Sequence, residues 1–275
     1  MRFKASTGRE ECTAERCADT APSFRSVQAH SKNSRSRTAA LVLALAVSPT
    51  ACRRSTDHAR ALPEKVDLAA LRAVYGEARY SQDDEETLIR AFFQDRRGGF
   101  FLDVGAGDPI RHSTTYYLEK HLGWTGIAVD AIAEYADAYA KERPGTHFFA
   151  YFAGDRSDTT HDFYVSEDRN FSSATGADPR GGIYQRRKVA TIALDDLLRR
   201  ENVSRLDFLS LDIEGSERIA LAGLDVLRYR PELVCVEISS PELGLSIAEY
   251  FALRGCREVS AYRAVDWINR YYSCR

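Results

Sequence analysis

Apolar positions in the carboxyl-terminal three quarters of the chain follow a pattern that alternates between helix and strand periods. Residues 63–75 begin with Pro63 and place apolar side chains on one face, which predicts an amphipathic helix with proline in its first turn. A second helix is predicted from Ser81, where Ser-x-x-Asp offers a capping box ahead of an apolar stripe. A third is predicted over 114–122, with Ser113 as its cap.

Five short apolar runs predict buried parallel strands. They are nearly continuous in apolar character, as strands covered on both faces are. Helical patterns separate several of them, which indicates right-handed crossovers that build one parallel sheet. We therefore expect an α/β, doubly wound, Rossmann-like fold with strands at 100–104, 126–130, 147–153, 206–212 and 232–238.

Two segments differ from this alternation. Residues 256–274 hold two β-prone stretches, 257–262 and 265–272, with no helix between them, which predicts a hairpin that completes the sheet. The polar segment 155–188 is predicted to be a long irregular insertion, either a functional lid or a solvated loop.

The first 60 residues are predicted to lie outside this domain, which is expected to span 61–275. Residues 1–38 are polar and aperiodic, which is typical of disorder. Residues 31–52 resemble a bacterial export signal that ends in a lipobox-like Cys52, and their apolar core is too short to span a bilayer. Two localisations stay open: cytoplasmic if the leader is no signal, and otherwise periplasmic or membrane-anchored through a lipidated Cys52.

Charge and cysteine content exclude two classes of function. The net charge is −2, and Lys and Arg are spread along the chain without the basic stripe that a nucleic-acid backbone requires. The six cysteines form no C-x-x-C pair, so a structural zinc site is not expected. Cys235 lies in an apolar run and is predicted to be a buried hydrophobe.

Candidate ligand-binding residues follow the predicted strands. In a doubly wound sheet, side chains after the carboxyl ends of the strands share one crevice. Gly105 and Gly107 follow the first strand and allow close approach of the backbone, and Asp130 ends the second strand, where it can accept hydrogen bonds from ribose hydroxyls. No third glycine follows, so a nucleoside is favoured over a dinucleotide.

The segment after the fourth strand brings two further carboxylates to the crevice. A strand would project Asp212 and Glu214 to the same side, with Gly215 allowing the turn into a helix. Asp212 is the first candidate for a general base, with Glu214 and His112 behind it. Capping of the next helix, pairing with nearby arginines and Mg²⁺ ligation remain alternatives.

The order of these motifs resembles the FkbM-type methyltransferases from about residue 80 to residue 238. The resemblance implies a class I methyltransferase sheet, S-adenosylmethionine as cofactor and usually O-methylation, with polyketide hydroxyls and sugars among the acceptors. One departure is Asp130-Ala131, where the family often has Glu-Pro. The resemblance rests on these segments: YSQ at 80–82, GFFLDVGAGDP at 99–109, STT at 113–115, GWTGI at 123–127, TIALDDLL at 191–198, LDFLSLDIEGSE at 206–217 and RPELVCVE at 230–237.

The sequence thus predicts a methyltransferase that acts on a hydroxyl of a small molecule or glycan. A catalytically silent, lipid-anchored binding protein with the same fold is the alternative, and a nicotinamide-dependent oxidoreductase is a weaker rival. No metal ligand is assigned, and Mg²⁺ has no support beyond the two carboxylates. The residues expected to bind the cofactor are Asp103, Gly105, Ala106, Gly107, Asp130 and Asp155.

Overall fold

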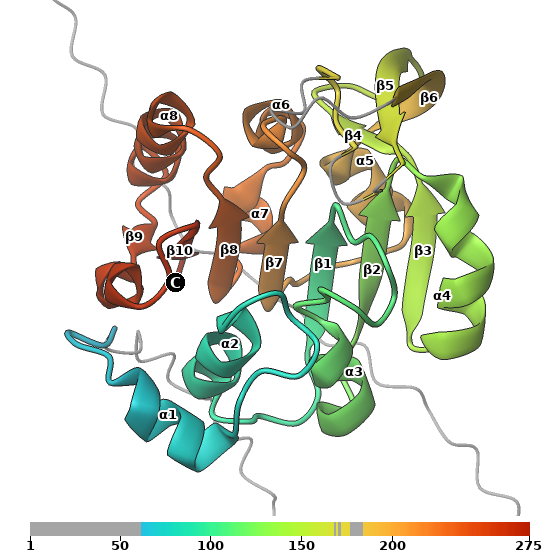
Figure 1. The fold of residues 1–275 in the computed structure, drawn as a ribbon. Coiled ribbons are helices and arrows are strands. Elements are labelled where there is room, and N and C mark those ends of the chain that lie inside the picture. The colour runs from blue at the N-terminus through green and yellow to red at the C-terminus, as the bar shows by residue number, and fades with distance from the viewer. Residues whose placement is uncertain (1–61, 168, 170–171, 177–183) are drawn as a thin grey trace, which may run out of the picture. The chain divides into compact units, whose positions relative to one another are not determined.

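The computed structural model describes residues 62–167, 169, 172–176 and 184–275 (Figure 1). The predicted leader, its export-like segment and Cys52 lie outside the described residues. Within the described part, no helix is both long and apolar enough to cross a membrane.

A seven-stranded sheet forms the centre of the domain, with strand order β3-β2-β1-β7-β8-β10-β9. Five of these strands are parallel neighbours: β1 (Phe100–Val104), β2 (Thr125–Asp130), β3 (Thr146–Ala150), β7 (Phe208–Leu211) and β8 (Leu233–Glu237). β10 (Asn269–Ser273) runs antiparallel to β8 and to the two-residue β9 (Arg257–Glu258). The doubly wound α/β fold and its antiparallel ending are confirmed, although the 3₁₀ helix η3 (Ser260–Ala264) shortens the predicted hairpin.

Helices cover both faces of the sheet (Figure 1). One face packs against α1 (Leu68–Tyr75), α2 (Glu85–Phe93) and α3 (Tyr116–Leu122). The other packs against α5 (Leu194–Arg200), α6 (Glu217–Ala222), α7 (Val226–Tyr229) and α8 (Pro241–Ala252). Side chains alternate between the two faces along each strand, so Phe208 points toward α2 while Leu209 points toward the other layer.

The first two helices begin later than the sequence pattern predicts. α1 begins after Asp67, whose side chain accepts a hydrogen bond from the Ala70 N–H at 3.1 Å. α2 begins at Glu85, and the predicted cap Ser81 accepts instead from the Glu86 N–H at 3.1 Å. The residues between Ser81 and the start of α2 are therefore bent rather than helical.

The segment 155–188 is less irregular than predicted. β5 (Thr160–Ser166) and β6 (Tyr184–Ala193) pair antiparallel, and β4 (Phe152–Gly154) joins β6 in a second, three-stranded sheet. The irregular prediction was wrong for these strands because polar side chains on their exposed faces masked the alternating pattern. The predicted strand 147–153 is likewise divided at Tyr151 between the two sheets.

The turn after β1 lies directly against the residue that follows β7. Gly105 has a φ of 80°, and a Cβ placed on it would lie 1.6 Å from the backbone oxygen of Asp212. The Gly105 N–H donates to the Val129 carbonyl at 2.8 Å, and the Asp212 N–H donates to the Val104 carbonyl at 3.0 Å. Only glycine fits this position, because any side chain would push apart the ends of two adjacent strands.

A buried arginine fixes the loop that follows this turn. Arg143 is fully buried and donates to Glu119 Oε2 at 2.7 Å, Thr115 Oγ1 at 3.1 Å and Ser113 Oγ at 3.2 Å. Its Nη2 also donates to the Thr146 hydroxyl oxygen, at the start of β3, at 3.2 Å. The loop 109–115 is thereby held against α3 and β3, so its position depends on one buried ion pair.

Gly105→Ala is expected to unfold the domain or to lower its thermal midpoint strongly, because the Cβ collides with backbone that has no room to move. Gly107→Ala is the matched control: its φ is 52°, but the nearest atom to a new Cβ is 4.0 Å away. The control is expected to cost only about 1–2 kcal/mol, the penalty of a left-handed alanine. Thermal and denaturant unfolding measure both variants, and equal losses would show that the Gly105 contact is not critical.

Arg143→Ala is expected to lower the free energy of unfolding by about 3–5 kcal/mol, because it leaves the buried Glu119 carboxylate without its partner. Lys141→Ala removes an exposed ion pair with Glu142 on the same helix, α4 (Ala136–Glu142), and should leave the stability unchanged. Urea titration of both variants tests this, and a loss in Arg143→Ala no larger than in the control would refute it.

Candidate active site

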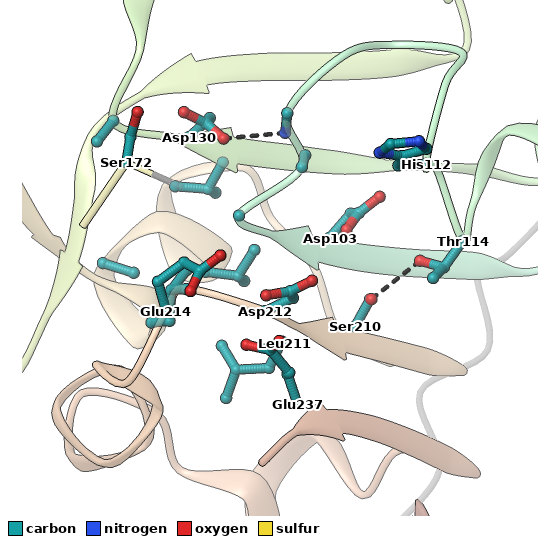
Figure 2. Close-up of a pocket in the computed structure, with 18 of the residues that line it drawn as sticks. Asp103, His112, Thr114, Asp130, Ser172, Ser210, Leu211, Asp212, Glu214 and Glu237 are labelled. Atoms are coloured by element: carbon teal, nitrogen blue, oxygen red, sulfur yellow. Dashed lines mark hydrogen bonds between the residues drawn. The ribbon is translucent and has the colours of Figure 1, made fainter. Parts of the chain in front are cut away.

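A cavity of about 470 Å³ lies at the carboxyl ends of the parallel strands. The crevice predicted at this edge of the sheet is therefore present, and Figure 2 shows residues from several strand ends converging on it. Eight of the nine predicted site residues line it: Asp103, Gly105, Ala106, Gly107, His112, Asp130, Asp212 and Glu214.

Asp155 is the exception and does not line the cavity. It lies on the surface, where its carboxylate pairs with the Arg156 guanidinium at 2.8 Å, and this hydrogen bond holds the pKa of Asp155 below its usual value. The reason is topological. Asp155 follows β4, and β4 leaves the main sheet to pair with β6, so the residue after it is not at the shared edge.

Asp130 is joined to the glycine turn at one end of the cavity. Its Oδ2 accepts from the Gly107 N–H at 2.9 Å (Figure 2). Its Oδ1 accepts from the Ile132 N–H at 2.8 Å. Burial raises the pKa of Asp130 to about 6, against the opposing effect of these two hydrogen bonds. The carboxylate is thus fixed in orientation beside the turn, with lone pairs left for hydroxyl donors.

Apolar side chains surround this end of the cavity. They come from the residues after β2 and from the second sheet, and they include two that the sequence did not single out, Phe152 and Phe163. Apolar walls next to a fixed carboxylate fit a nucleoside, whose base is flat and whose ribose carries two hydroxyls. We call this part of the cavity the nucleoside end; its apolar lining includes Val129, Ala131, Ile132, Tyr135, Phe152, Ala153 and Phe163.

Asp103 lies beneath the cavity, within β1. It is buried, and its Oδ2 accepts a 2.6 Å hydrogen bond from the Thr115 hydroxyl. Burial raises the pKa of Asp103, while Thr115 and the nearby Arg143 lower it. Its hydrogen bond therefore links β1 to the loop that Arg143 fixes.

A row of polar side chains crosses the other end of the cavity. Leu211 of β7 pairs with Val236 of β8, and Glu237 pairs with Asn269 of β10, so three neighbouring strands present polar groups side by side. The Asn269 amide donates to Glu85 Oε1 at 3.2 Å, which continues the row onto α2. We call this the acidic end of the cavity; its polar residues are Glu85, Asp212, Glu214, Glu237 and Asn269.

The carboxyls of Asp212 and Glu237 face one another at the acidic end (Figure 2). Burial and the neighbouring Glu237 raise the pKa of Asp212 well above its usual range. Burial raises the pKa of Glu237 to about 7. Neither carboxylate forms an ion pair with a described residue, so the predicted alternative of arginine pairing does not apply to Asp212.

Glu217 holds the loop that carries Asp212 and Glu214. It is fully buried, and its Oε1 accepts from the Ile213 N–H at 3.0 Å and the Gly215 N–H at 3.2 Å. Glu214 and Gly215 both have positive φ, 54° and 92°, which a loop bent around one carboxylate requires. The cap position of the next helix, α6, is occupied by Ser216, while Asp212 and Glu214 line the cavity.

His112 lies in the loop after the glycine turn, with an exposed side chain and a φ of 59°. The start of this loop is bent around Asp108, whose Oδ1 accepts from the Ile110 N–H at 3.0 Å and the Arg111 N–H at 2.9 Å. The structure therefore brings His112 to the cavity wall.

The described cysteines include one buried thiol, which the sequence predicted, and one disulfide, which it did not. Cys235 is buried and unpaired, and burial raises the pKa of its thiol, as expected of a structural hydrophobe. Cys256 and Cys274 form a disulfide between the start of β9 and the end of the chain, which spacing alone did not indicate. Among the residues described, no three His, Cys, Asp or Glu side chains are placed to hold a metal ion.

Comparison with known proteins gives one family match. The model of the family described as Methyltransferase FkbM domain matches residues 103–258, more than half of the chain. No curated protein matches.

Several solved structures are distantly similar. An O-methyltransferase from Bacillus cereus in complex with SAH is 14% identical, with 74% of this chain and 86% of that chain covered and a TM-score of 0.37. A SAM-dependent methyltransferase from Aquifex aeolicus is 14% identical, with coverages of 76% and 98% and a TM-score of 0.36. A precorrin-6y C5,15-methyltransferase from Geobacter metallireducens GS-15 is 14% identical, with coverages of 73% and 92% and a TM-score of 0.38.

These distant likenesses add nothing to the assignment. It rests on the family match, on the observed strand order and on the cavity at the carboxyl edge of the sheet. The matched residues include the glycine turn, Asp130 and the segment from Asp212 to Glu217. The chain belongs to the FkbM methyltransferase domain family.

Proposed function

We propose that this protein is an S-adenosylmethionine-dependent methyltransferase that methylates a hydroxyl group of a small molecule or glycan. The observation that carries the proposal is the contact between the Gly105 turn and Asp212, beside the Asp130 carboxylate. It places a nucleoside end and an acidic end next to each other in one cavity.

The nucleoside end fits the adenosine of S-adenosylmethionine. Asp130 would accept hydrogen bonds from the ribose hydroxyls, the Gly105 and Gly107 backbone would permit close approach, and the apolar walls would contact adenine. The bound cofactor would supply an electrophilic methyl group on a positively charged sulfur.

The acidic end fits a neutral acceptor that carries hydroxyl groups. Ionised carboxylates only accept hydrogen bonds, and hydroxyls are donors that can satisfy them. A hydroxyl must lose its proton as it attacks, and Asp212, with a pKa raised by burial and by Glu237, is a stronger base than an ordinary aspartate. The acceptor would share the cavity of about 470 Å³ with the cofactor, which favours a small molecule or a terminal sugar.

A second candidate is the catalytically silent, lipid-anchored binding protein. The Cys256–Cys274 disulfide favours it, because disulfides persist mainly in oxidising compartments, outside the cytosol where S-adenosylmethionine is made. Such a protein would have no need of the cofactor, so cofactor binding separates the two candidates.

Isothermal titration of the full chain with S-adenosylhomocysteine (SAH) is the primary test. We expect binding at micromolar concentrations, and Asp130→Asn should weaken it by about 10- to 100-fold, the loss of hydrogen bonds to a charged acceptor. Because the pKa of Asp130 is raised to about 6, affinity should fall as the pH drops through 6 and the carboxylate takes up a proton. Asp155→Asn, outside the cavity, is the matched control and should bind normally. No binding up to millimolar SAH would refute the proposal.

Asp212→Asn should retain SAH binding and lower methyl transfer by about two orders of magnitude or more, the scale of losing a general base. Transfer of a radioactive methyl group to a panel of hydroxylated small molecules and glycans measures this, with any acceptor that the wild type modifies. If the variant transfers the methyl group as fast as the wild type, Asp212 is not the base.

A further inference from the structure

Asp212 and Glu237 form a carboxyl pair created by strand register. Leu211 and Val236 are partners in the β7–β8 ladder, so the next residues, Asp212 and Glu237, leave adjacent parallel strands side by side. Both line the cavity, and Figure 2 shows their carboxyls directed at one another. The second oxygen of Glu237, Oε2, is buried and has no hydrogen-bond partner among the described residues.

Among the described residues, no basic side chain forms an ion pair with either carboxyl of this pair, and no basic side chain is among the groups that shift their pKa values most. Glu85 faces it from α2, Glu214 and Glu217 from the β7–α6 segment, and Cys235 from β8. Asp266 and Tyr271 lie beyond Cys235 on the side of β10. Arg111, His112 and Arg169 also line the cavity. Arg111 pairs with Asp108 at 3.2 Å, and the Arg169 guanidinium lies 5.4 Å from the ring centroid of Tyr135, at the nucleoside end.

Two facing carboxylates without a cation cannot both ionise readily near neutral pH, because each charge raises the cost of the other. Once one carboxyl of the pair has ionised, its negative charge raises the pKa of the other. The pair therefore titrates as one unit that retains a proton where separate exposed carboxyls would have none.

We propose that the Asp212–Glu237 pair keeps a shared proton in the free protein and releases it when the positively charged methyl donor binds, but not when neutral SAH binds. The proposal rests on the proposed function, and it makes Glu237 the proton-sharing partner of the base. Because the Gly105 turn touches the Asp212 backbone, a donor held by this turn would bring its positive charge close to the pair.

Proton balance over one turnover agrees with this coupling. Donor binding would send the shared proton to solvent and leave both carboxylates ionised opposite the positive sulfur. During transfer, the acceptor oxygen forms a bond to the methyl carbon, the carbon–sulfur bond breaks, and its electron pair stays on sulfur. The acceptor's hydroxyl proton passes to the pair, which again holds one proton opposite neutral SAH. The base is thereby generated only while the donor is present.

Proton release during binding can be measured without knowing the acceptor. S-adenosylmethionine and SAH differ only in one methyl group and one positive charge, so groups at the nucleoside end, Asp130 included, contribute equally to both titrations. Calorimetric titration of the full chain near pH 7, in buffers of different ionisation enthalpy, gives the protons released per ligand bound. We expect the donor to release about one proton more than SAH does, the stoichiometry of one shared site.

Glu237→Gln should bind both ligands and reduce the difference, because it removes the second carboxyl, whose charge adds to the effect of burial on the pKa of Asp212. Glu249→Gln, an exposed carboxyl on α8 outside the cavity, is the control and should keep the wild-type difference. In the wild type the difference should shrink as the pH rises further and the free pair loses its proton unaided. This pH series also tests the proposal if Glu237→Gln does not fold.

The outcomes separate this inference from the proposed function. Equal proton release by the two ligands, with binding intact, would overturn the shared proton and leave the methyltransferase proposal in place. A difference that persists undiminished in Glu237→Gln would show that Glu237 has no share in the proton and would equally overturn the inference. Failure of both ligands to bind would instead overturn the proposed function.

Discussion

The close backbone contact between Gly105 and Asp212 is the constraint on which the site depends. It brings the turn after β1 and the end of β7 together without an intervening side chain. Because Asp130 is hydrogen-bonded to the same turn through Gly107, the nucleoside end is fixed relative to the first carboxylate of the acidic end. The positions that we propose for the donor and the base are therefore set by main chain rather than by flexible side chains.

Placing buried carboxyls close together at the acidic end costs free energy of folding, and the surrounding structure holds these residues in place. Several carboxyls gather at one edge of the sheet, no described basic side chain forms an ion pair with Asp212 or Glu237, and burial raises the pKa of both. The loop around them is bent onto Glu217, while the facing loop is tied down by Arg143. The carboxyls of this cluster repel one another when they are ionised. A positively charged cofactor bound beside them would reduce that repulsion.

The site residues at the ends of individual strands were predicted from the sequence. The site residues that distant segments bring to the cavity through tertiary packing were not. The apolar runs gave the parallel strands, and the ends of those strands gave the glycine turn, Asp130 and Asp212. Glu85 and Asn269 were missed because α2 and β10 reach the cavity only through tertiary packing. Asp155 was predicted to bind the cofactor, but the break at Tyr151 sends β4 into the second sheet, and the residue after β4 does not line the cavity.

A crystal structure of the protein with bound SAH would show directly where the cofactor lies. We expect the ribose hydroxyls to contact the Asp130 carboxylate, adenine to lie among the apolar residues around Phe152, and sulfur to point toward Asp212. Ligand bound away from the Gly105 turn, or with its sulfur turned away from Asp212 and Glu237, would contradict this expectation.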